Sequence, residues 1–187
     1  SRVLSVGLMR LILDACVLYP TILREILIGV AERGGVTPLW SARILGEWQH
    51  AAARLGAEGA LIASGEVALL RAHWPDAEIP ADPALEARLS LPDPADCHVL
   101  AAAIAGRAEA VVTLNLRDFP TRRLEGLRAL SPDTLLMDLW LADSAMVEQA
   151  VAEVQARSEA ISGQPRPLRP LLKRAKLPRL GKALGAR

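Results

Sequence analysis

The sequence predicts an α/β fold in which a central parallel sheet is flanked by helices and followed by a helical C-terminal extension. Two short apolar runs, residues 11–13 and 110–114, have the composition of strands that are buried on both faces. Stretches with apolar residues at helical spacing lie between them. Strands that alternate with helices favour a parallel sheet, and such sheets bind ligands beyond the carboxyl ends of their strands.

Three helices are expected in the first half of the chain. Apolar residues recur at helical spacing over residues 20–33, and a pair of glycines ends that helix. Ser41 is a suitable N-cap for a second helix that runs to about residue 55. A third helix is expected over residues 60–73, where Pro75 ends it.

The second half is expected to alternate loops, helices and one edge strand. Residues 75–95 contain five prolines and are expected to form a loop with a short strand near Glu78 and Ile79. Beyond that loop we expect an Ala-rich helix over 95–105, an edge strand within 124–130, a helix opened by Ser131 and Pro132, a long helix over 144–161, a linker over 163–170 and one or two short helices in the tail.

The composition is that of a globular chain with one domain and a small appendage. Of the 187 residues, 51% are hydrophobic and 23% are charged, so a core can form without disulfides. Cys16 and Cys97 have no metal-binding or redox spacing and are expected to be reduced thiols of a cytoplasmic protein. No apolar run is long enough to span a membrane. Residues 1–8, which precede Met9, are expected to be an upstream start or a cloning remnant.

Charge is distributed unevenly along the chain, although the net charge is only +1. Residues 157–187 contain nine Lys or Arg and one acid, whereas the rest contains 13 basic and 20 acidic residues. The tail is therefore strongly positive and the body negative. Such an asymmetry suggests that the tail contacts nucleic acid, a protein partner or the acidic body itself.

Four acids lie near the predicted strand ends and helix starts: Asp14, Glu47, Asp96 and Asp118. Carboxylates that share one cleft repel one another unless a cation relieves the repulsion. Mg²⁺ and Mn²⁺ prefer oxygen ligands, and one or two such ions support in-line attack on phosphorus. Because the chain has 21 Asp and Glu residues, four acids alone do not identify a site.

Three stretches resemble motifs of the PIN-domain family. Residues 11–20 (LILDACVLYP) resemble its opening strand, which ends in the first metal-binding Asp. Residues 92–103 (PDPADCHVLAAA) resemble its third acid and the Ala-rich helix that follows. Residues 111–119 (VVTLNLRDF) resemble its last strand and loop, with Asp or Asn before an Asp-Phe pair. Glu47 lies between these motifs, on the helix where the family keeps its second acid.

The resemblance, which extends to VapC-type toxin ribonucleases, implies a three-layer PIN-like domain over residues 9–140 and a basic helical extension over residues 141–187. It implies that Mg²⁺ or Mn²⁺ is held by the four acids and that the catalytic site comprises Asp14, Glu47, Asp96, Asp118 and Asn115. The implied activity is metal-dependent hydrolysis of RNA by the toxin of a type II toxin–antitoxin pair. The implied partners are an RNA substrate, a protein antitoxin and a second copy of the chain, the last through the helix over 20–33 and the helix after it.

Two residues depart from the usual pattern of the family and keep an alternative open. Asn115 stands where many relatives have Asp, and Cys16 stands where a small polar residue is common. The alternative is a PIN-like module that binds RNA or protein and has weakened catalysis. A phosphatase with a phosphorylated Asp is disfavoured, because Cys16 replaces the second acid of the usual Asp-x-Asp pattern.

A few other residues have weaker interpretations. Arg117, Arg122 and Arg123, in or near the last loop, are either ordinary surface charge or groups that steer a phosphate backbone. Asp93 is expected to be a loop acid. His98 is expected to be structural, because no His or Cys partner stands at metal-binding spacing.

Overall fold

The computed structural model describes residues 9–185 and has the predicted α/β architecture, a parallel sheet with helices on both faces. The segment 1–8, for which an upstream origin was expected, lies outside the described residues. The helices and strands in chain order are β1 (Arg10–Leu13), α1 (Ala15–Leu18), α2 (Thr21–Glu32), β2 (Thr37–Leu39), α3 (Ala42–Ala53), α4 (Ala57–His73), α5 (Pro83–Arg88), α6 (Cys97–Ala105), β3 (Ala110–Val112), β4 (Arg128–Leu130), α7 (Pro132–Ala142), α8 (Ser144–Ser162), α9 (Leu168–Arg174) and α10 (Pro178–Gly185). Short 3-10 turns occupy Pro94–Asp96, Leu116–Asp118 and Thr121–Arg123.

The sheet has four parallel strands in the order β2-β1-β3-β4. The two predicted buried strands, β1 and β3, are its central pair, and Leu11 is in register with Ala110. The sequence did not indicate β2, because Pro38 cannot donate to a neighbouring strand. As an edge strand β2 tolerates that proline. The predicted edge strand within 124–130 is correct, but β4 occupies only its last three residues.

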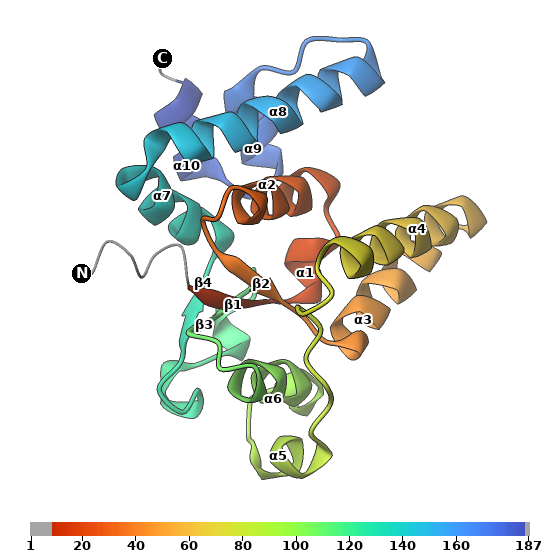
Figure 1. Cartoon of the computed structure of the whole chain (residues 1–187), viewed down its shortest axis with the longest axis vertical. Helices are drawn as coiled ribbons and strands as arrows, with labels where there is room; N and C mark the ends of the chain where they lie inside the picture. The colour runs from red at the N-terminus through yellow and green to blue at the C-terminus, as the bar shows by residue number, and fades with distance from the viewer. Residues whose placement is uncertain (1–8, 186–187) are drawn as a thin grey trace.

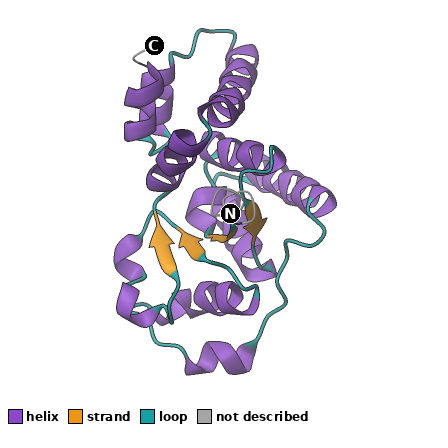
Figure 2. Ribbon diagram, turned by 60° about the vertical axis from the view of Figure 1, so that its left-hand side comes forward, coloured by secondary structure: helices purple, strands orange, loops and turns teal. Residues whose placement is uncertain are grey.

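The elements form three layers. Figure 1 shows α1 and α2 on one face of the sheet and α6 on the other, with α8 beyond α2. Contacts of α2 with β2, and of α6 with both central strands, establish these layers. Figure 2 shows the strands enclosed by helices when the molecule is turned. The carboxyl ends of β1 and β3 lead into the segments that hold the predicted acids.

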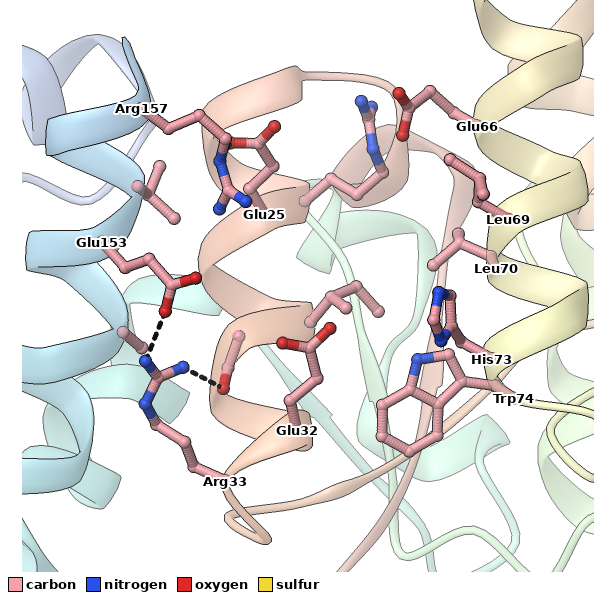
Figure 3. A pocket seen from close by; sticks show the side chains of 15 residues that line it. Glu25, Glu32, Arg33, Glu66, Leu69, Leu70, His73, Trp74, Glu153 and Arg157 are labelled. Atoms are coloured by element: carbon pink, nitrogen blue, oxygen red, sulfur yellow. Dashed lines mark hydrogen bonds and ion pairs between the residues drawn. The ribbon is translucent and has the colours of Figure 1, made fainter. Parts of the chain in front are cut away.

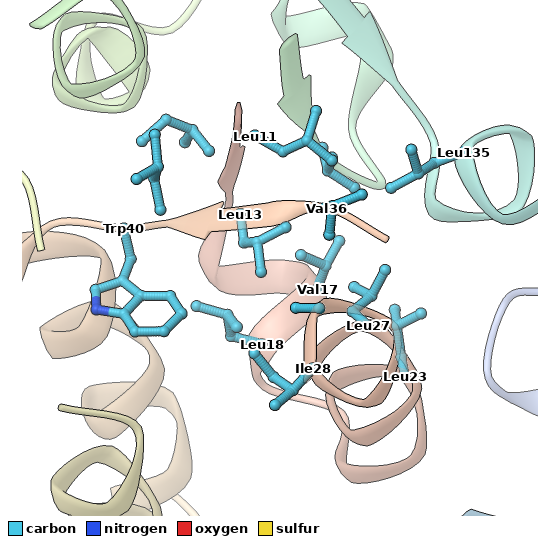
Figure 4. Close-up of a cluster of buried hydrophobic side chains, with 14 of the residues drawn as sticks. Leu11, Leu13, Val17, Leu18, Leu23, Leu27, Ile28, Val36, Trp40 and Leu135 are labelled. Atoms are coloured by element: carbon cyan, nitrogen blue, oxygen red, sulfur yellow. The ribbon is translucent and has the colours of Figure 1, made fainter. Parts of the chain in front are cut away.

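One continuous hydrophobic core joins the layers. The central strands are almost fully buried, and aliphatic side chains of the helices pack against them. Figure 4 shows the part of this core in which side chains from β1, α1 and α2 gather near Trp40 and Leu135. Because the chain has few aromatic residues, the core is built from Leu, Ile, Val and Ala, as the composition predicts.

Helix starts follow the expected capping chemistry, with two corrections. The Ser41 hydroxyl accepts a hydrogen bond from the Ile44 N–H at 3.1 Å, which confirms the predicted start of α3. Helix α4 begins at Ala57, three residues before the predicted start. Helix α5 was not predicted, although Asp82 caps it and Pro83 opens it, because the five prolines of the segment masked that signal. The strand expected near Glu78 is a single bridge to Trp40.

The C-terminal helices pack on the domain and are not detached from it. Helix α8 lies against α2 and buries Val147, Val151 and Val154. The expected linker over 163–170 is shorter than predicted, because α9 already begins at Leu168. The boundary at residue 140 stays a prediction. None of the helices within residues 9–185 combines the length and apolar character that a membrane span requires.

Candidate active site

Asp14 lies directly after β1, where its carboxylate is held in place by three hydrogen bonds, from Ala15, Thr113 and Cys16. Its Oδ1 accepts from the N–H of Ala15 at 2.8 Å, and its Oδ2 accepts from the hydroxyl of Thr113 at 2.9 Å. The residue is only 7% exposed. Burial raises the pKa of Asp14, and the negative charge of Glu47 adds to that rise, while the hydrogen bonds oppose it. A buried, oriented carboxylate with a raised pKa is typical of a functional site.

Thr113 and Cys16 form the support beneath this carboxylate. Thr113 is fully buried at the end of β3, and its hydroxyl also accepts the N–H of Asn115 at 3.1 Å. The Cys16 sulfur accepts a hydrogen bond from the N–H of Leu114 at 3.3 Å, and its thiol donates one to Oδ2 of Asp14 at 3.6 Å. Burial, followed by the charge of Asp14, raises the pKa of the thiol to about 11, so Cys16 is protonated at neutral pH. Cys16 therefore acts in the polar support of Asp14.

Asp96 lies close enough to the other candidate acids for their charges to act on it. It ends the 3-10 turn before α6, and its side chain makes no capping hydrogen bond there. Its pKa is raised to about 6, first by burial and then by the negative charges of Asp14, Asp93, Asp118 and Glu47. Four separate segments of the chain thus place carboxylates close enough to oppose ionisation of Asp96. This repulsion places the other three candidate acids near Asp96, and their joint role in one site stays a prediction.

Glu47 reaches the cluster from α3 and pairs with a histidine. The Nε2 atom of His98, on α6, contacts the Oε1 atom of Glu47. His98 is buried, whereas about half of the Glu47 side chain is exposed. His98 was expected to be structural, and in the structure it connects α6 to Glu47, the candidate acid of α3. Its position two residues after Asp96 was the available sequence signal.

The loop after β3 brings the last candidates to the same edge of the sheet. Asp118 is partly buried in the 3-10 turn that follows Asn115, and its charge acts on Asp96. Asn115 is exposed and lies beside Thr113 through its backbone N–H. The side chains of Arg117, Arg122 and Arg123 are all exposed in this loop. Asp93, expected to be a loop acid, accepts the N–H of Ala95 at 2.9 Å and also adds its charge to the cluster.

The donor set fits a hard divalent cation in chemistry and charge. All its side-chain donors are carboxylate or amide oxygens, which Mg²⁺ and Mn²⁺ prefer. Burial, followed by the negative charges of four neighbouring carboxylates, raises the pKa of Asp96, and a bound cation would offset the repulsion among these charges. Within residues 9–185, however, no three acid, His or Cys side chains already converge closely enough to hold a metal ion. Binding would therefore require side-chain rotation, including that of Glu47, whose carboxylate contacts His98.

Sequence reasoning missed Thr113 as a functional candidate. Its hydroxyl contacts a carboxylate that is 99 positions away in the chain. The signal was a polar residue inside the apolar run 110–114, which by itself is common in strands. The parallel pairing of β1 with β3 brings Thr113 next to Asp14, and only this pairing shows that Thr113 belongs to the site.

Comparison with known proteins identifies the family. The family model described as PIN domain matches residues 10–117, which is more than half of the chain. The chain belongs to the PIN-domain family. A Mycobacterium tuberculosis protein named "Putative ribonuclease VapC50" is 51% identical over 45 residues, a match that covers 23% of this chain and 27% of that protein. The chain thus matches only about a quarter of that relative's length. No solved structure shows significant similarity.

The PIN-domain match contains Asp14, Glu47, Asp96 and Asn115 and ends one residue before Asp118. A separate cavity of about 260 Å³ lies between α2, α4 and α8. Figure 3 shows acids and bases around it, including an ion pair of Arg33 with Glu153. None of the candidate acids lines this cavity. The chemistry of the PIN domain is therefore expected at the carboxylate cluster, outside this cavity.

Proposed function

We propose that this PIN domain is a metal-dependent endoribonuclease. The observation that carries the proposal is the gathering of Asp14, Glu47, Asp93 and Asp118 around Asp96, whose pKa is raised to about 6 first by burial and then by their negative charges. Repulsion among such charges destabilises the folded state unless a bound cation compensates them. The family match and the ribonuclease name of the relative support RNA as the substrate.

We assign the proposed residues to three roles, which are metal binding, orientation of Asp14 and attraction of RNA. Asp14, Glu47, Asp96 and Asp118 would hold Mg²⁺ or Mn²⁺, with Asn115 at the same edge. A cation held there would supply charge neutralisation at the phosphodiester and would lower the pKa of a bound water. Thr113 and the N–H of Ala15 keep Asp14 in one orientation. Arg117, Arg122 and Arg123 are exposed in the adjoining loop and are proposed to attract the RNA backbone.

The reaction is hydrolysis. Water forms a new bond to phosphorus, the bond between phosphorus and one sugar oxygen breaks, and a proton from the water ends on the leaving oxygen. No oxidant or further reactant is needed. The chain contributes placement and charge, which are the main needs of phosphodiester cleavage.

Cleavage of a labelled RNA by the full chain tests the proposal. With Mn²⁺ we expect cleavage that EDTA abolishes and that Asp14→Asn lowers more than about 100-fold, since even the outer partners of metal ligands contribute 10- to 100-fold. Asp138→Asn is the matched control, because Asp138 is an exposed acid on α7. Equal cleavage by Asp14→Asn and the parent chain would remove the proposed site.

A second candidate is a PIN-domain module that binds RNA or protein with weakened catalysis. It is favoured by the absence, within residues 9–185, of three side chains already arranged around one metal position. The contact of His98 with Glu47 also occupies one proposed ligand. RNA binding by the parent chain without Mn²⁺- or Mg²⁺-dependent cleavage would support this candidate.

We propose in addition that the protein is the toxin of a toxin–antitoxin pair and forms a dimer. The name of the relative supports the first idea. The exposed apolar residues Leu61, Ile62 and Leu69 on α4 support a partner surface on that helix. The dimer helices expected from the sequence were α2 and α3, of which α2 is partly covered by α8 and α3 packs against α4. Growth arrest on expression that Asp14→Asn abolishes would test the toxin role, and light scattering of Leu61→Lys would test the dimer.

A further inference from the structure

The last two helices carry an exposed basic surface that the proposed active site does not use. No acid occurs after Glu159. Six cationic side chains of α9, α10 and the turn between them are exposed, and we call them the C-terminal basic surface: Arg169, Lys173, Arg174, Lys176, Arg179 and Lys182. Exposed charge of one sign on so short a segment is unusual and requires a physical account.

Close packing makes the two helices one unit. A Cβ atom placed on Gly181 would lie 3.2 Å from the backbone oxygen of Arg169, so the helices approach closely there. Beneath them Leu172, Leu180 and Leu184 are buried. The cations therefore project from one rigid hairpin of helices, and the loss of side-chain freedom on binding is the main ordering cost.

The charge of this surface is not compensated within the described residues. None of its six cations forms an ion pair there. Asp133 also bonds to the hairpin, because its two carboxylate oxygens accept the backbone N–H groups of Arg179 and Leu180. That carboxylate is buried and fixes the start of α10. A polyanion would relieve the remaining repulsion among the cations.

The surface is remote from the carboxylate cluster. Figures 1 and 2, which share a vertical axis, both place the C-terminal helices at one end of the molecule, away from α6 and α5 at the other end. Asp96 precedes α6, and α10 packs on α7. A ligand on the basic surface is therefore bound independently of the candidate active site.

We infer that the C-terminal basic surface binds the sugar–phosphate backbone of nucleic acid without reading its sequence. Phosphate contacts need only Lys and Arg, and they give affinity but no base recognition. A protein partner would instead be anchored by apolar or aromatic groups at the centre of its interface. The exposed large hydrophobic residues lie elsewhere, and the nearest in the chain is Ile161 on α8. The composition of the surface thus favours nucleic acid over an acidic protein.

Binding of a short labelled oligonucleotide, measured by fluorescence anisotropy against salt, tests the inference. The full chain carries Asp14→Asn and is kept in EDTA, so the outcome does not depend on nuclease activity. The triple variant Lys173→Gln, Arg174→Gln, Lys182→Gln is expected to bind about tenfold or more weakly. Its slope of log affinity against log salt should fall by about 2, since each lost phosphate contact on a single strand removes roughly 0.7.

The matched control neutralises three other exposed arginines: Arg88→Gln, Arg107→Gln and Arg128→Gln. It should retain the parent's affinity and slope, and equal melting temperatures should show that both triple variants fold. Oligothymidylate and 2′-O-methyl RNA serve as separate probes, because the same phosphate chemistry occurs in DNA and RNA; binding of either one supports the inference. An unchanged slope in the C-terminal variant overturns it, as does binding of polyglutamate in preference to both oligonucleotides.

Discussion

At the scale of single residues, Asp96 shows how a candidate site can oppose the stability of the fold that holds it. Its folded-state pKa, about 6, lies above the ordinary value of 3.8, so the folded chain binds this proton more tightly than the unfolded chain does. The stability of the metal-free protein is therefore expected to fall as pH rises from about 4 to about 6 and to stay lower above that window.

Asp96→Asn should remove this penalty. At pH 7 in EDTA we expect the free energy of unfolding to rise by the order of 1 kcal/mol, because solvent screens a partly exposed carboxylate. That corresponds to about 2–4 °C in Tm for a chain of this size. Thermal unfolding from pH 4 to pH 8 measures it. Added Mn²⁺ should raise the Tm of the parent chain more than that of the variant, and a lower Tm for metal-free Asp96→Asn would contradict the argument.

Thr113 is the second residue-scale prediction. Thr113→Val keeps the shape of the buried side chain but removes the hydroxyl that donates to Asp14. We expect a loss of about 1–2 kcal/mol in urea denaturation and a 10- to 100-fold loss of RNA cleavage. Thr113→Ser keeps the hydroxyl and should restore most of the cleavage. A Val variant with full activity would show that the orientation of Asp14 does not depend on Thr113.

At the scale of elements, capping determines where the helices begin and how the tail is attached. Ser41 fixes the start of α3, and that helix presents Glu47 between one and two turns later. Asp133 acts over a longer range, because a residue of α7 caps α10 with hydrogen bonds of 2.9 and 3.0 Å. The start of α3 could be predicted from sequence, since its cap is adjacent. The cap of α10 could not be, because its donor and acceptor are far apart in the chain.

Asp133→Ala should therefore loosen α10 selectively. The loss of two capping hydrogen bonds at a buried carboxylate is expected to cost about 1–2 kcal/mol. Amide hydrogen exchange should become faster in α10 than in α2. Asp138→Ala, on the exposed side of the same helix, should leave exchange unchanged. If α10 keeps its protection in Asp133→Ala, the buried apolar contacts alone hold the tail.

At the scale of the whole molecule, the C-terminal helices share the core of the PIN domain. Helix α8 buries three valines, and Leu172, Leu180 and Leu184 of the last helices belong to the same hydrophobic cluster. Such continuity favours cooperative unfolding. The domain boundary expected at residue 140 stays a prediction, and its role in folding can be measured.

The full chain is expected to unfold in a single transition. A chain that ends at residue 140 should lose more than about 5 kcal/mol, because the apolar surface of α2 becomes exposed. It should also bind a hydrophobic dye. A chain that ends at residue 163 keeps α8 and should have intermediate stability. Two separate transitions in the full chain would instead show that the extension folds independently.

The sequence by itself determined the two central strands, most helices and the identity of the candidate acids. Apolar runs, helical spacing and caps are local patterns, because each depends on residues that are close together in the sequence. Helix α5 and strand β2 were not predicted, because prolines in or near them obscured the sequence patterns typical of a helix and a strand. Asp14 and Asp96 could be named because each stands at the end or start of an element that is visible in the sequence.

Only the tertiary structure decided which of these groups act on one another. The contact of Thr113 with Asp14, the pairing of His98 with Glu47 and the shared repulsion at Asp96 each join distant parts of the chain. The parallel register of β1 with β3 and the placement of α6 beside them create these contacts. Electrostatic coupling depends on distance in space, and that distance is set by packing.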